Sequence, residues 1–481
     1  MAAVTQARPP SALKREFTFR STFSLAFAFI SPIIGLYTIF ALALGAAGPA
    51  FWLGFAIVLA GQVLVAIVLA ELSSVWPLAG GLYKWTQKLA GPHVGWAAGW
   101  AYTWTLIVLI TAQCYAAAPF VTSLVGIDDA STGLLILLAA AILVLATAVN
   151  WLGPRALKLF VALSITAEVL GSIVIGTILL LFFREQPLSA VFGGGAAMDV
   201  GLAPMLAAVA LIGWSFIGFE SAGDIAEEVK EPRREVPRAL VLSLVVVGLI
   251  VMYAALGLVL AIPDLGAAMS GSTADPIADT ITAHLGAGIA KPLFAMVVLA
   301  FVAGIAAVQA AVSRVLFSLG RDRELPAGGR LSELSGPDRL PRNAIAVSAV
   351  AAAAFLFVAL SENAYATLLS MATVGFYIAF AFPVFAALAA RLRGRWTTGV
   401  WNVGRLGLGI NAVAAAWLAF EIVNIAWPRL PDAPWYVNYG AVSVVVAVAV
   451  AGIAVRGAMR RPDPAAVAVP ENVAIEQGVA R

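Results

Sequence analysis

Two glutamates lie inside long apolar stretches of this chain, where a carboxyl group can take up a proton or bind an amine. Glu168 lies within the apolar stretch 157–183, and Glu220 lies within the stretch 204–228. A charge at the centre of a bilayer costs at least ~2.5 kcal/mol, so a carboxyl group at that depth needs a partner or a bound proton. Both glutamates are therefore candidate functional residues.

Two of the apolar stretches also contain residues that interrupt a helix. The first carries Pro32, which removes a backbone donor and clashes with the preceding turn, and Gly35, which tolerates irregular conformations. The sixth carries Gly213 and Gly218, just before Glu220. Unwound backbone at such breaks exposes amide and carbonyl groups that can bind a solute near the bilayer midplane. The alternative is a simple kink or close helix packing, which proline and glycine also produce in membrane helices.

The elements that must position these residues are membrane-spanning helices. Hydrophobic residues make up 62% of the 481-residue chain and charged residues 11%, whereas soluble domains are about one-quarter charged. Lipid cannot satisfy backbone polar groups, so apolar stretches of this length are expected to be helical. Twelve spans are predicted, at 22–47, 50–74, 93–123, 132–150, 157–183, 204–228, 237–262, 290–320, 343–360, 364–390, 406–427 and 438–456.

The distribution of basic residues predicts the orientation. With the N-terminus in the cytoplasm, the inside segments carry 25 Lys and Arg residues, and the outside segments carry only Arg184, Lys291 and Arg429. This positive-inside bias places both termini in the cytoplasm. The expected location is the cell (plasma or inner) membrane.

The two breaks lie five spans apart, which predicts an all-α fold of two inverted five-helix repeats plus two further helices. The segment 82–89 is amphipathic and is expected to lie along the membrane surface. The expected domains are a cytoplasmic arm at 1–21, helices 1–5 at 22–183, helices 6–10 at 204–390, helices 11 and 12 at 406–456, and a disordered cytoplasmic tail at 457–481. Glu421 falls outside the ten-helix core, and its expected role is at an interface or in packing.

Several segments resemble the amino acid–polyamine–organocation (APC) superfamily of permeases. They are WSFIGFES at 214–221, EEVKEPRREVPR at 227–238, PLAGGLY at 77–83, NWLG at 150–153 and RDRELP at 321–326. The first span and the Gly80-Gly81 region are most similar to the amino acid/choline branch, which includes GABA permeases. The resemblance covers residues 20–460 and implies a LeuT-like fold in which helices 1 and 6 are broken.

The resemblance also implies a substrate site built on the two breaks. Ile33 and Ile34 depart from the small residues that usually hold a substrate carboxylate there, so only backbone amides remain for that role. Trp214 and Tyr102 correspond to aromatic residues that cover the substrate in similar antiporters, although either can simply pack helices together. The implied residues are Ser31, Pro32, Ile33, Ile34, Gly35, Tyr102, Trp214, Ser215, Ile217, Gly218, Glu220 and Gln309.

Other carboxylates receive different interpretations. Glu220 is expected to face a substrate amine or to help close the inner side. Several proton-coupled members of the superfamily have a lysine at the position of Glu168, and the hypothesis here is that Glu168 carries the coupling proton. A cation-attracting or permanently neutral Glu168 is the alternative. Carboxylates near the cytoplasmic ends are expected to pair with loop cations such as Lys84 or Arg233; these are Glu71, Asp224, Glu227 and Glu228.

These features predict a secondary active transporter that moves an amino acid or related amine by alternating access, coupled to protons. Alternatives are a sodium-coupled or exchange transporter of choline or polyamine-type cations, with Ser313 as a possible sodium ligand, and a channel. No metal-ligand cluster or phosphate-binding loop appears, so no enzyme activity, metal or cofactor is expected. A net charge of +3 with scattered basic residues argues against nucleic-acid binding. The expected partners are the solute, a proton or sodium ion, and the lipid bilayer.

Overall fold

The chain is almost entirely helical. The structure is a computed structural model that describes residues 13, 15–127, 130–192, 201–272, 275–357, 364–429 and 435–459. Within these residues every named element is a helix, and the only β-type pairings are two isolated bridges, Phe17 with Val229 and Ser335 with Leu340. Eleven helical segments of the described part are long and apolar enough to cross a membrane. The predicted all-α polytopic membrane fold is confirmed.

Uninterrupted apolar stretches form long helices, because lipid offers the backbone no other hydrogen-bond partner. These helices are α4 (Phe51–Val75), α6 (Pro92–Val125), α7 (Thr132–Leu152), α12 (Pro232–Ala261), α15 (Ala287–Arg321), α18 (Ala364–Leu392), α19 (Gly407–Ala426) and α21 (Gly440–Ala458). Shorter helices are α3 (Phe40–Ala47), α5 (Gly81–Ala90), α13 (Leu265–Ser270), α14 (Pro276–Leu285), α16 (Gly328–Leu331), α17 (Arg342–Phe355) and α20 (Trp435–Asn438).

The predicted ninth span, 343–360, corresponds to α17, which has 14 residues. Among the described helices that match predicted spans, it alone is shorter than the length needed to cross a membrane. Residues 358–360 of that prediction lie outside the described residues, as does nearly all of the predicted tail at 457–481. The twelve predicted spans therefore correspond to eleven long helical segments and one shorter apolar helix.

Three of the apolar stretches are not regular α-helices throughout. The first is divided at Ser31 into α1 (Phe19–Ile30) and α2 (Pro32–Tyr37). The sixth consists of α10 (Leu202–Ile212), a 3-10 turn η4 (Gly213–Phe216), an irregular stretch at 217–220, and α11 (Ser221–Asp224). The fifth runs from α8 (Pro154–Glu168) through a π-helical turn, η2 (Val169–Val174), into α9 (Ile175–Phe182). Residues 31–35, from Ser31 through the first turn of α2, are called the first break below, and residues 213–220 the second break.

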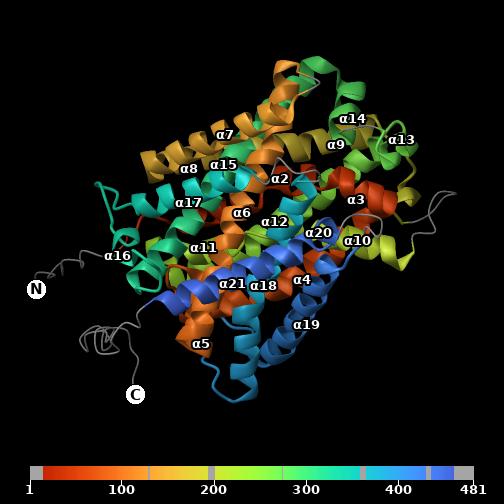
Figure 1. The fold of residues 1–481 in the computed structure, drawn as a ribbon. Helices are drawn as coiled ribbons and strands as arrows, with labels where there is room; N and C mark the ends of the chain where they lie inside the picture. The colour runs from red at the N-terminus through yellow and green to blue at the C-terminus, as the bar shows by residue number, and fades with distance from the viewer. Residues whose placement is uncertain are drawn as a thin grey trace, which may run out of the picture.

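The helices form one bundle around these irregular segments (Figure 1). In the view shown, α7 and α8 lie along the upper side, and α19 lies along the lower side. The helix α1 packs against α8, α12 and α15, and η4 packs against α2, α4, α12 and α18. The small helices α5 and α16 lie at one end of the bundle, and α13 and α14 lie at the other (Figure 1).

The amphipathic segment predicted at 82–89 forms a helix, α5, and its location along the membrane surface stays a prediction. Leu82, Tyr83 and Trp85 are fully buried, because α5 packs across the ends of α6 and α18. The apolar face of α5 therefore covers protein at one end of the bundle. This end, called the α5 end below, carries most of the ion pairs described next.

Candidate functional site

The first break is produced by three consecutive residues. Ser31 has a φ of 51°, outside the right-handed helical region, so it ends α1. Pro32 then starts α2 at the first helical position, where a missing N–H costs nothing. The Ser31 hydroxyl oxygen accepts a hydrogen bond of 3.1 Å from the Ile34 amide and so caps the new helix.

The same serine connects the first break to Glu168. The Ser31 hydroxyl donates to Glu168 Oε2 at 2.7 Å, and Ser164, one turn earlier on α8, donates to Oε1 at 2.6 Å. The backbone of Ile33 faces the same carboxyl group. Glu168 is fully buried, and no cation of the described residues lies within salt-bridge distance of it. A buried carboxyl group held by hydroxyls, without a fixed counter-charge, is suited to gaining and losing a proton.

The two breaks are in direct contact. The Ser215 hydroxyl donates to the carbonyl oxygen of Gly35 at 2.5 Å. A Cβ atom on Gly35 would lie 3.2 Å from the carbonyl oxygen of Ser215, so this close approach requires glycine. Gly218 has a φ of 106°, and the Phe29 ring occupies the place where its Cβ would project. The first and sixth apolar stretches therefore approach each other closely at the first and second breaks.

Glu220 is held at the far side of the second break by α6. Its Oε2 accepts from the Gly218 amide at 3.0 Å, and its Oε1 lies 2.9 Å from the Tyr102 hydroxyl. The same hydroxyl lies 2.7 Å from Asp224 Oδ2. One hydroxyl hydrogen can donate to only one of two carboxylates, so a proton on either acid completes the set of hydrogen bonds. Buried like charges with a single donor favour one shared proton.

The expectation for Asp224 was wrong. It was predicted to pair with a loop cation, but it is fully buried beside Tyr102, and Lys84 pairs with Asp322 instead. The reason is that α11 is short and turns Asp224 inward, toward α6.

The remaining predicted binding residues fall into two groups. Trp214 and Ile217 are 3% and 4% exposed, and Ser31, Ile33, Ile34 and Ser215 are equally buried, so the site is closed to solvent from both sides in this conformation. Gln309 instead contacts α7, accepting from Asn150 at 3.0 Å and donating to Thr147 at 2.9 Å. The structure thus brings the first break, the second break and Glu168 together, and it places Gln309 in a separate polar contact.

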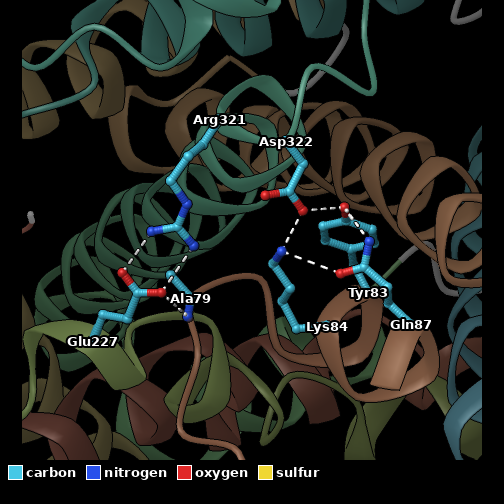
Figure 2. Close-up of polar contacts among 7 residues, drawn as sticks. All are labelled: Ala79, Tyr83, Lys84, Gln87, Glu227, Arg321 and Asp322. Atoms are coloured by element: carbon cyan, nitrogen blue, oxygen red, sulfur yellow. Dashed lines mark hydrogen bonds and ion pairs between the residues drawn. The ribbon is translucent and has the colours of Figure 1, made fainter. Parts of the chain in front are cut away.

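Ion pairs close the α5 end of the bundle beneath this site (Figure 2). Arg321 binds Glu227 through two hydrogen bonds of 2.9 Å, and the Ala79 amide donates to the same carboxylate at 3.1 Å. Beside it, Lys84 forms an ion pair with Asp322, which also accepts from the Tyr83 hydroxyl. These contacts join α5, the end of α15 and the segment after α11. They are called the α5-end network, comprising Ala79, Tyr83, Lys84, Glu227, Arg321 and Asp322.

Burial and neighbouring charges shift the pKa values of this network in opposite directions. Burial lowers the pKa of Lys84, and the neighbouring Asp322 carboxylate only partly offsets that effect. For Glu227, burial favours the neutral acid, but the hydrogen bonds and charge of Arg321 outweigh it and hold the pKa below its ordinary value. The network is therefore stable only while both partners of each pair are present.

Three further ion pairs lie at the same end, and one of them corrects a pairing expectation. Glu228 pairs with the buried Arg314 at 2.8 Å, and Glu71 pairs with Arg391. Glu71 thus pairs with a cation at a cytoplasmic loop, as expected, whereas the partner of Glu228 lies within α15 and not in a loop. The third pair joins Arg456 to Glu324. The reason is tertiary, since α15, α18 and α21 end beside the acidic residues.

The N-terminal arm crosses this closed end. Phe17 is 2% exposed, and its amide donates to the Glu228 carbonyl at 3.0 Å while its own carbonyl accepts from the Lys230 amide at 2.9 Å. The Lys158 ammonium lies 4.8 Å from the centre of the Phe17 ring. Leu13 packs against Ala79 and Phe317. The arm therefore holds together α8, α15 and the segments that carry the α5-end network.

Two residues at the site were not singled out from the sequence. Ser164 lies four residues before Glu168, and this spacing places both side chains on one helix face, so a serine at i−4 of a buried glutamate was a readable signal. Asp224 lies four residues after Glu220, but the backbone around Glu220 is irregular, so the i,i+4 spacing of a helix does not apply there. The orientation of Asp224 toward Tyr102 therefore had no such signal.

No metal centre accompanies these groups: among the described residues, no three His, Cys, Asp or Glu side chains come together as ligands. A cavity of about 250 Å³ lies elsewhere, between α6, α18 and α21, with lining residues such as Trp100, Ile378 and Val448. None of the predicted binding residues lines it.

Comparison with known proteins agrees with this architecture. The family model described as "Amino acid permease" matches residues 21–450. The chain belongs to the amino acid permease family. This permease is 24% identical over 465 residues to the rice protein named "Amino-acid permease BAT1 homolog", with 90% of this chain and 88% of that protein covered. It is 25% identical to Amino-acid permease BAT1 of Arabidopsis thaliana, with 91% and 90% covered.

A bacterial relative has a more specific name. The "Glutamate/serine transporter AimA" of Bacillus subtilis is 27% identical over 433 residues, covering 85% of this permease and 77% of that protein. The predicted membership of the APC superfamily is confirmed, and the permease is a multi-pass membrane protein of amino acid transport.

Proposed function

We propose that this permease is a proton-coupled secondary active transporter of an amino acid or a related amine, working by alternating access. The observation that carries the proposal is the 2.7 Å hydrogen bond between Ser31 at the first break and Glu168. It puts a proton-accepting group in contact with backbone that can bind solute. A change in the protonation of Glu168 would therefore directly alter the charge and hydrogen bonding at the first break.

The substrate class rests on the chemistry of the two breaks and on the relatives. Unwound backbone at the first break offers amide donors for a carboxylate, and Glu220 with Asp224 offers an acidic side for an amine. Trp214 and Tyr102 supply apolar surface between them. The relatives are named as amino-acid permeases or as a glutamate/serine transporter, which favours an amino acid over choline or a polyamine.

Protons are favoured over sodium by the surroundings of Ser313. Its hydroxyl accepts a hydrogen bond of 3.0 Å from the guanidinium of Arg314, which is itself 3% exposed. This guanidinium is paired with Glu228, so it disfavours a sodium ion mainly as a hydrogen-bond donor that already occupies the Ser313 oxygen. Glu168 has no such cation beside it.

Alternating access requires the α5 end to open. The positive-inside bias assigns this end to the cytoplasm, with both termini on the same side of the cell membrane. In this conformation the α5-end network and the N-terminal arm close it. Release of the solute to the cytoplasm would then require Arg321 and Lys84 to separate from their carboxylates.

Uptake by purified protein in liposomes tests the proposal. The wild type should accumulate a labelled amino acid when an inward proton gradient is imposed, with saturable counterflow in the absence of a gradient. Glu168→Gln should lose gradient-driven accumulation while keeping counterflow, and Glu333→Gln, which changes an exposed carboxylate, should behave as the wild type.

Unchanged gradient-driven uptake by Glu168→Gln would contradict the role of Glu168. Uptake that requires sodium and ignores the pH gradient would contradict proton coupling. Single-channel currents without saturable counterflow would identify a channel instead.

A further inference from the structure

Glu421 lies in a second polar cluster inside the bundle, on α19, away from Glu168. It is fully buried, and its one hydrogen bond in the described structure is a 3.3 Å contact from Asn424 to Oε1. Its Oε2 has no hydrogen-bond partner. A carboxylate in this position would lose its hydration without replacement, which strongly disfavours the charged form.

Neutral polar groups face Glu421 from the helices packed around α19. Tyr377 of α18 lies within electrostatic reach of Glu421 and next to Gln62 of α4. Gln62 and Tyr377 are fully buried, and their polar side-chain atoms make no hydrogen bond. Trp417, one turn before Glu421, packs its ring against Gly61 with its Nε1 also unpartnered. Buried polar atoms without hydrogen-bond partners thus come from α4, α18 and α19 near Glu421.

The charges around the cluster do not neutralise an ionised Glu421. In the part of the chain that the structure describes, Arg429 is the one charged group that acts on Glu421. Its guanidinium donates to Asn424 at 2.6 Å and to the Trp427 carbonyl at 3.2 Å, rather than to Glu421. From α10, the Leu206 backbone carbonyl accepts from Asn424 at 3.1 Å.

The cluster also touches the second break. A Cβ atom on Gly213 would lie 3.1 Å from the Tyr377 hydroxyl and 3.2 Å from the Thr373 methyl group. The tyrosine oxygen therefore lies directly against the backbone at which η4 begins. Hydrogen bonds join Arg429, Asn424 and Glu421, and Tyr377, within electrostatic reach of Glu421, lies against Gly213.

We propose that Glu421, Tyr377 and Gln62 form a second proton-binding site, in which protonation of Glu421 controls how Tyr377 supports the second break. With a proton, Glu421 has an O–H donor that Tyr377 or the Gln62 carbonyl can accept, and the set of buried polar groups becomes complementary. Without it, the carboxylate competes for the Tyr377 hydroxyl hydrogen and draws the ring away from Gly213. The proton comes from bulk water at the Arg429 end of α19.

Proton binding at Glu421 stands on this geometry alone, whereas its consequence for solute movement rests on the proposed transport function. The site is separate from Glu168, which lies on α8 and contacts Ser31 of the first break, whereas Glu421 lies on α19. The helix α19 lies outside the two repeats expected from the sequence. The proposal assigns it a role in the conformation of the second break.

Infrared difference spectroscopy of the solute-free, full-length protein in nanodiscs tests proton binding. A pH step should produce a carboxylic acid C=O band that is lost in Glu421→Gln and retained in Glu168→Gln and Glu333→Gln. An unchanged band in Glu421→Gln would overturn the proposal. Because no solute is present, this result does not depend on whether the protein transports amino acids.

Hydrogen exchange of the segment 213–220, normalised to intrinsic rates, tests the link to the second break. The wild type should show a severalfold change in protection across the pH range in which the Glu421 band changes. Tyr377→Phe should keep the infrared band and lose the change in protection, while α7 should show none in any variant. Persistence of the full pH response in Tyr377→Phe would overturn the proposed link.

Discussion

The Ser215 hydroxyl donates a 2.5 Å hydrogen bond to the Gly35 carbonyl, and this contact joins the irregular segments of the first and sixth helices. It lies between the two groups of acidic residues, Glu168 on one side and Glu220 with Asp224 on the other. Movement of one break is therefore transmitted to the other through a single short side chain that is hydrogen-bonded to backbone.

Gly35→Ala should impair transport more than stability. The new Cβ would lie 3.2 Å from the Ser215 carbonyl oxygen and 3.3 Å from its Cα, and both are backbone atoms that cannot rotate away. The two breaks must move apart, so we expect kcat/KM for uptake to fall at least tenfold, equivalent to ~1.4 kcal/mol. Gly133→Ala on α7, where a Cβ meets nothing within 4 Å, is the matched control. Equal uptake by the two variants would show that the contact is dispensable.

Tyr102→Phe should weaken the hold on Glu220 and Asp224. The two acids lose the hydroxyl they share, and a hydrogen bond to a charged group contributes about 1.5–3 kcal/mol. We expect solute affinity, measured by thermal shift and by uptake, to fall roughly tenfold or more. Tyr253→Phe removes a hydroxyl that contacts Thr177 at 2.7 Å, away from both breaks, and should leave affinity unchanged. A larger loss of affinity in this control than in Tyr102→Phe would contradict the assignment.

Arg321→Gln should open the α5 end, and the effect should depend on pH. The pKa of Glu227 is held below its ordinary value of 4.5, so its charged contacts stabilise closure above that value and are lost as pH falls through the lower pKa. Without Arg321 the effect of burial dominates and the pKa rises. Closure should then fail at a higher pH than in the wild type.

Cysteine labelling measures this opening. Cys114 is the sole cysteine and is buried, so Ala79→Cys in a Cys114→Ala background reports on the α5-end network alone. A membrane-impermeant maleimide should label this residue faster in the Arg321→Gln variant and only in inside-out vesicles. Arg330→Gln changes an exposed cation at the same end and is the control. Labelling in right-side-out vesicles would contradict the predicted orientation.

Phe17→Ala should loosen the N-terminal arm. The ring is 2% exposed and lies under Lys158, and removing a buried phenyl ring typically costs about 3–5 kcal/mol. We expect a lower melting temperature and faster labelling of Ala79→Cys. Phe182→Ala, which removes a ring that is 74% exposed on the bundle surface, should change neither. Unaltered labelling in Phe17→Ala would show that the arm does not contribute to closure.

Local signals in the sequence predicted the irregular segments. Proline at position 32 and glycine at positions 35, 213 and 218 act on their own backbone, so their effect could be anticipated without knowing the fold. The long spans followed from apolar length alone. These signals account for where the helices are interrupted and for the depth at which Glu168 and Glu220 lie.

Local signals in the sequence could not predict which cation pairs with which carboxylate. Tyr83 and Asp322 are 239 residues apart, and Arg391 and Glu71 are 320 apart. Which cation meets which carboxylate depends on how the ends of α15, α18 and α5 come together, and charge alone does not distinguish Lys84 from Arg391. The same limit explains why Asp224 was expected at a loop cation and Gln309 at the substrate.

The π-helical turn that begins directly after Glu168 gives α8 an adjustable register. A π turn holds one residue more than an α turn. If the π turn moved past Glu168 toward the N-terminus, Glu168 would rotate by about 100° relative to α9 and leave Ser31. A sliding defect of this kind would let the carboxyl group face the first break in one state and a different helix in another, at little conformational cost.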